Sequence, residues 1–164
     1  MRWRCSVCGR EHEGLPRDWA FEQPRYWDGP RTPDDRLSDD LCVWRDDDGE
    51  LSYFIRGLLT IPVVDDEGDL RYGFWSSLSK ASFDRVVELW DDPRRTEEPP
   101  YFGWLASAAP GYPDTHGLAV DVVTADLELR PQLVLHDADH PLVREQREGI
   151  TLARVREIAE ANLH

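Results

Sequence analysis

The sequence has few cysteines and no long apolar segment. Only three of its 164 residues are cysteine, and two of these form a Cys-x-x-Cys pair, which favours metal or redox chemistry over structural disulfides. No apolar run approaches the roughly 18 residues that a membrane-spanning helix needs. The start of the chain, Met1–Cys5, also lacks the apolar core of a signal peptide. We therefore expect a cytoplasmic protein that does not cross a membrane.

Basic residues are also scarce. Nineteen Lys and Arg residues stand against 33 Asp and Glu residues, which gives a formal net charge of −14. Such an acidic surface repels phosphate backbones and anionic membranes unless basic residues cluster. The only adjacent basic pair is Arg94-Arg95. The composition argues against binding to nucleic acid or to a membrane surface.

Apolar residues make up 40% of the chain and include seven tryptophans, enough for a substantial core. The length suits a single domain over residues 1–164. Within it we expect a metal-binding knuckle at 1–17, a surface loop rich in Pro and Asp at 18–40, and an α+β core at 41–164.

Segments rich in β-branched and aromatic residues predict five strands, with Gly57 marking a bulge in the second. The strands are expected at residues 41–44, 52–64, 70–78, 118–124 and 129–135. Ser79 is a suitable N-cap for a helix that ends before Pro93. Two more helices are expected near the end of the sequence, the first beginning at Pro141 after Asp139 or His140, the second capped by Thr151.

This order of elements predicts a fold class. Strands followed by a helix, more strands and then helices indicate an α+β protein with a mainly antiparallel β-sheet. The expected architecture has one mid-chain helix, two C-terminal helices and an N-terminal zinc-knuckle-like loop.

The strongest chemical pattern is Cys5-x-x-Cys8 with His12. A two-residue gap lets both sulfur atoms face one ion from a tight turn, and Gly9 allows the close backbone approach. Zinc binds thiolates and imidazole in this way. Cys42 is the only remaining cysteine, so we expect it to be the fourth ligand of a structural zinc that links the N-terminal loop to the sheet. The alternative is that Cys42 is a small buried apolar residue.

Two further readings compete with this one. A thioredoxin-like redox pair needs its first cysteine at a helix N-terminus, and the Gly and Pro residues that follow Cys8 argue against a long helix there. His136 and His140 lie with two aspartates before Pro141 and could bind a metal. Because this segment joins a strand to a helix, we favour helix capping for it instead.

Several stretches in this order resemble one bacterial family. They are Cys5–Gly9 with His12 and Leu15-Pro16, Asp40–Val43, Phe54–Gly57 with Ile61-Pro62, Phe74–Ser79, Phe102–Leu105, and Asp139–Leu142 with Gln146 and Gly149-Ile150. Over nearly the whole chain the sequence resembles domain of unknown function 2199. The resemblance implies a small bacterial domain and implies no activity. It also mildly favours Cys42 as the fourth ligand.

Two functions of different classes remain open. The first is a zinc-stabilised, non-enzymatic interaction or regulatory module, whose acidic surface suits a basic protein partner. The second is a small hydrolase or transferase with a site near Trp104 and His140, in a pocket that Trp75 would also line. No complete set of catalytic residues is visible, so we favour the first, and the sequence predicts no oligomeric state.

Overall fold

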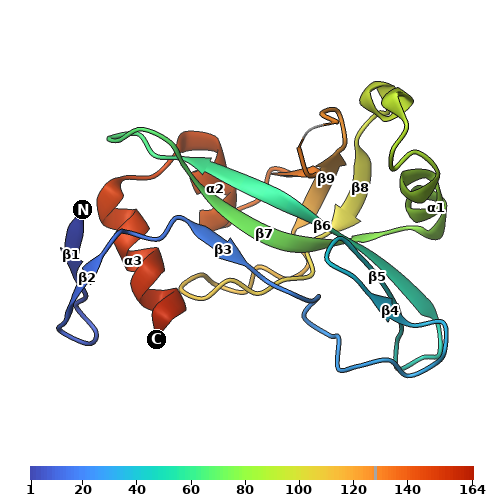
Figure 1. The fold of residues 1–164 in the computed structure, drawn as a ribbon, viewed down its shortest axis with the longest axis horizontal. Coiled ribbons are helices and arrows are strands. Elements are labelled where there is room, and N and C mark those ends of the chain that lie inside the picture. The colour runs from blue at the N-terminus through green and yellow to red at the C-terminus, as the bar shows by residue number, and fades with distance from the viewer. Residues whose placement is uncertain (128) are drawn as a thin grey trace.

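A long hairpin forms the centre of the fold (Figure 1). The computed structural model describes residues 1–127 and 129–164; Glu128, within the turn expected between the last two strands, lies outside this description. Strands β6 (Leu51–Pro62) and β7 (Asp69–Leu78) pair antiparallel from Tyr53↔Leu78 to Pro62↔Asp69. The acidic turn between them contains Gly68 at φ +86°, a conformation that favours glycine.

Six further strands extend this hairpin into an eight-stranded sheet with the order β3-β7-β6-β10-β9-β8, while β5 pairs with both β6 and β4. Two pairs are parallel, β3 with β7 and β10 with β6, and the rest are antiparallel. The α+β prediction with mainly antiparallel pairing is therefore confirmed. The bounds are β3 (Asp18–Ala20), β4 (Arg36–Leu37), β5 (Leu41–Arg45), β8 (Tyr101–Trp104), β9 (Ala119–Val123) and β10 (Gln132–Leu135).

The three helices occur where the sequence predicts them. They are α1 (Lys80–Glu88), α2 (Pro141–Glu148) and α3 (Leu152–Leu163), and a short 3-10 helix spans Pro93–Glu97. The side chains of Ser79, His140 and Thr151 accept hydrogen bonds from backbone N–H groups in the first turns of these helices. Local capping chemistry thus fixes where each helix begins.

Two expectations about the strands are wrong. The segment 18–40 is not only a surface loop, because β3 and β4 lie within it and pair with β7 and β5. Gly57 does not mark a bulge, since it pairs in register with Phe74. It is required because β10 passes close by: a Cβ at position 57 would lie 2.8 Å from both Leu133 Cδ2 and the Pro131 carbonyl oxygen.

Apolar side chains pack on both faces of the hairpin. The main cluster lies on one face, where Leu59 and Tyr72 meet side chains of α2 and α3. The far end of the sheet curls back toward β7, because the Ala106 N–H donates to the Trp75 carbonyl oxygen at 2.8 Å. A second cluster packs on the opposite face and is composed of Cys42, Trp44, Phe54, Trp75 and Ala106.

We predict that the substitution Gly57→Ala destabilises the protein by about 1–3 kcal/mol, because the added methyl group overpacks a tight contact. Gly73→Ala is the matched control on β7, where the nearest atoms to a new Cβ would be those of Ala20 at 3.4 and 3.5 Å. The free energy of unfolding, measured in urea, should change little in this control. Equal losses in both variants would contradict the close-approach explanation.

Candidate metal centre

The first seventeen residues begin with a tight hairpin. Strands β1 (Arg2–Arg4) and β2 (Glu11–Glu13) pair so that Trp3 lies opposite His12. Within the loop between them, the Gly9 N–H donates to the Cys5 carbonyl oxygen at 3.0 Å, and Gly9 has φ +70°. This is the tight turn that the Cys-x-x-Cys spacing predicts.

The turn brings three donor atoms together. The Sγ atoms of Cys5 and Cys8 and a ring nitrogen of His12 all lie within 4.8 Å of one another. Cys8 Sγ is 3.4 Å from His12 Nε2, and the His12 ring stacks on Trp3 at 4.9 Å between centroids. In a tetrahedral zinc site, neighbouring ligand atoms are about 3.5–3.8 Å apart. The three residues therefore offer the donor types of a metal site at close range.

A second imidazole lies beside Cys5 of this group. The Nε2 atom of His164, directly after α3, lies 3.2 Å from Cys5 Sγ although the two residues are 159 positions apart. Nothing in the sequence around His164 indicates this contact, because only the fold brings α3 to the knuckle.

Helix α3 is held against the knuckle by polar and apolar contacts. The Glu160 carboxylate accepts hydrogen bonds from the Ser6 N–H at 2.7 Å and from the Ser6 hydroxyl at 2.6 Å. The hydroxyl and then the N–H hold the pKa of Glu160 below its usual value. Trp3 and Cys5 pack on Ala159, and Figure 1 shows β1 and β2 beside α3. These contacts hold the end of α3, and with it His164, beside Cys5.

Cys42, the expected fourth ligand, is not brought to this group. It is fully buried in the second cluster, on β5, where it pairs with Phe54 of β6. Burial raises the pKa of its thiol to about 12, and the nearby charge of Asp35 adds to this effect. Its surroundings match the alternative reading, a small buried apolar residue.

The structure also bears on the two competing interpretations, the thioredoxin-like pair and the His136–His140 segment. Cys5 and Cys8 lie in a hairpin turn rather than at the start of a helix, so the geometry of a thioredoxin-like pair is absent. His140 caps α2: its Nδ1 accepts from the Leu142 N–H at 3.0 Å, and its Nε2 faces the carbonyl oxygens of Pro113 and Asp114. Both ring nitrogens are engaged, as capping predicts.

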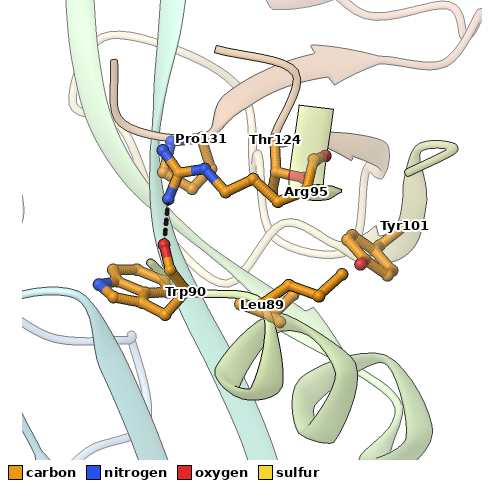
Figure 2. Close-up of a pocket in the computed structure, with 7 residues that line it drawn as sticks. Leu89, Trp90, Arg95, Tyr101, Thr124 and Pro131 are labelled. Carbon is orange, nitrogen blue, oxygen red and sulfur yellow. Dashed lines mark hydrogen bonds between the residues drawn. The ribbon is translucent and has the colours of Figure 1, made fainter. Parts of the chain in front are cut away.

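The three residues of the alternative enzyme site lie in different environments. Trp75 is fully buried in the second cluster, Trp104 is half-exposed on β8, and His140 is buried at the start of α2. The cavity in Figure 2 lies elsewhere, beside Leu89 and Tyr101, and its volume is about 10 Å³. That is room for about one water molecule. Arg95 crosses this cavity and donates to the Trp90 carbonyl oxygen at 2.7 Å, which indicates an architectural role.

The two kinds of cysteine should differ sharply in reactivity. A hydrogen bond from the Arg10 N–H, followed by one with His12, lowers the pKa of Cys8 from 9.0 to about 6. Iodoacetamide alkylates the thiolate form of cysteine and not the thiol form. We predict that in chelator-treated, folded protein Cys8 reacts with iodoacetamide at a rate that rises with pH through about 6, while Cys42 stays unmodified at neutral pH. Peptide mass spectrometry measures both, and comparable rates at the two sites would contradict the assignment.

No helix in the described part of the chain is long and apolar enough to span a membrane. Neither a curated protein nor a solved structure matches the chain. A family model described as "Uncharacterized protein conserved in bacteria (DUF2199)" matches residues 4–150. The matched range includes Cys5, Cys8 and His12 and ends before α3 and His164. The chain therefore belongs to DUF2199, the bacterial family that its sequence motifs resemble.

Proposed function

We propose that Cys5, Cys8 and His12 hold a structural zinc ion and that His164 supplies the fourth ligand. Two observations carry this proposal: the donor atoms of Cys5, Cys8 and His12 lie within 4.8 Å of one another, and His164 Nε2 lies 3.2 Å from Cys5 Sγ. Zinc favours this donor set in tetrahedral geometry. Cys42 has no part in the proposed site.

Four protein ligands leave no open position for water or substrate, so the ion would have a structural role rather than a catalytic one. Bound zinc would link the β1–β2 knuckle to α3, adding to the Ser6–Glu160 hydrogen bonds and the Trp3–Ala159 packing. Metal binding that requires the folded arrangement adds its free energy to folding. The ion would therefore stabilise the fold.

For the protein as a whole we propose a non-enzymatic interaction or regulatory module. Support comes from an exposed aromatic face on the outside of β8 and β10, which we call the outer face. Its apolar members are Phe102, Trp104 and Val134, exposed by 46%, 52% and 47%. The rings of Phe102 and Trp104 are in edge contact at 4.9 Å. Exposed aromatic side chains commonly anchor protein partners, and a net charge of −14 suits a basic one.

We predict that the purified protein contains one equivalent of zinc and that removing the metal lowers the melting temperature by several degrees. Cys8→Ser should abolish stoichiometric binding. His164→Ala should weaken zinc affinity by at least about tenfold, because it leaves the ion with three protein ligands. Elemental analysis and competition with a chromophoric chelator measure the two effects.

Two control variants make this test specific. Cys42→Ala and His136→Ala remove a cysteine and a histidine outside the proposed site, and both should retain wild-type zinc affinity. Loss of zinc in Cys42→Ala would restore Cys42 as a ligand. Unchanged affinity in His164→Ala would remove His164 from the site, and metal-free wild-type protein would overturn the zinc proposal.

We predict that the outer face mediates binding to the protein partner. In affinity capture from the native bacterium at low salt, Trp104→Ser should lose proteins that the wild type retains, because it removes an aromatic anchor. Val87→Ser on α1 is the matched control, since Val87 is similarly exposed at 48%. Quantitative mass spectrometry compares the samples. A set of captured proteins unaffected by Trp104→Ser would argue against this face.

A further inference from the structure

An open groove runs across β3, β7 and β6 on the face of the sheet opposite the main cluster, and none of the proposed zinc ligands lines it. Its volume is about 390 Å³, within the range of small-molecule sites. Ala20 of β3 pairs with Gly73 of β7, and Gly73 pairs in turn with Leu58 of β6. These apolar residues, two of them small, form the floor of the groove. The full lining is Asp18, Trp19, Ala20, Arg56, Leu58, Arg71, Gly73 and Arg130.

The charge of this groove is opposite to that of the protein. It contains three arginines and one carboxylate, Asp18, whose Oδ1 pairs with Arg71 Nε at 3.2 Å. The whole chain carries 33 acidic residues against 19 basic ones. Arg130 is exposed, and its guanidinium makes no hydrogen bond or ion pair with any described residue. The groove is thus a local region of positive potential on an acidic surface.

Arg56 is the most informative of the three arginines. Arg56 is only 8% exposed, yet among the described residues no carboxylate pairs with its guanidinium. Its Nη1 donates to the Asp39 carbonyl oxygen at 3.2 Å, and its guanidinium carbon lies 5.8 Å from the centre of the Trp75 ring. Its Nε is buried and has no partner in the described part of the chain. A buried cation without a counter-charge is costly.

The missing Cβ of Gly73 opens the groove beside this cation. A Cβ at position 73 would lie 3.7 Å from Arg56 Nε, so the absence of a side chain at Gly73 leaves space next to the guanidinium. Arg56 and Leu58 alternate along β6 with Leu59, which faces the main cluster, and so they point to the opposite side. The buried cation therefore borders an accessible hollow with an apolar floor.

We propose that this groove binds a small organic anion. Its carboxylate or phosphate group would pair with the guanidinium groups of Arg56 and Arg130, since planar guanidinium matches both oxyanions in a bidentate manner. The apolar part of the ligand would lie over Gly73 and Leu58. Arg71, already paired with Asp18, would contribute positive potential from the edge of the groove. None of the proposed zinc ligands and none of the residues of the outer face lines this groove.

The test uses zinc-replete, isotope-labelled protein in a buffer without phosphate. Benzoate and phenyl phosphate serve as probes for the two oxyanions, and benzamide is the uncharged control. We expect both anions, or the one that the site prefers, to shift the amide signals of Leu58 and Gly73 with a dissociation constant near 1 mM. Benzamide should not shift them. The preferred probe then identifies the oxyanion class.

Arg56→Gln removes the buried guanidinium from the site. Variants of exposed arginines keep the test interpretable if that protein fails to fold. Arg130→Gln should weaken anion binding about tenfold, the loss expected for one charge-assisted hydrogen bond. Arg94→Gln, in the 3-10 helix outside the groove, changes the net charge equally and should leave affinity unchanged. The proposal is overturned if neither anion shifts these signals at about 10 mM. It is equally overturned if benzamide matches the anions, or if the two arginine variants bind alike.

Discussion

The register of the β6–β7 hairpin is the constraint on which the rest of the structure depends. Successive side chains of a strand point to opposite faces, so the pairing decides which residues face the main cluster and which face the second one. Leu59 and Tyr72 pack with the helices, whereas Phe54 and Trp75 pack with β5 and its neighbours. A slip of one residue would reverse these assignments and bury Arg56 in the main cluster. The packing of the helices and the position of Arg56 in the groove therefore both depend on this one ladder.

The parts of the fold that local chemistry determines could be predicted from the sequence. Ser79, His140 and Thr151 cap the helices through bonds to residues two or three positions away. Cys5, Cys8 and His12 converge because a single turn spans them. In each case the relevant atoms lie close in sequence, so spacing rules capture the geometry.

Contacts between distant segments could not be predicted in this way. Cys42 was the only spare cysteine, but elimination by residue type ignored where β5 pairs, and the fold places His164 beside Cys5 instead. Gly57 looked like a bulge because a glycine within a strand has two explanations, and the approach of β10 decides between them. A search for basic residues adjacent in the sequence could not find the basic groove either, since Arg56, Arg71 and Arg130 come from separate segments.

Strand β3 connects the metal centre to the groove on the other side of the sheet. Its central residue, Trp19, packs against the cluster formed by Trp3, Cys5 and Ala159. Its neighbours Asp18 and Ala20 line the groove, and Asp18 pairs with Arg71. A three-residue edge strand has few backbone hydrogen bonds of its own, so the packing of Trp19 contributes much of what holds it to β7. Zinc that tightens the knuckle would also fix the position of Asp18 and Ala20. Because coupling between two sites is reciprocal, an anion that orders β3 would stabilise the knuckle by the same free energy.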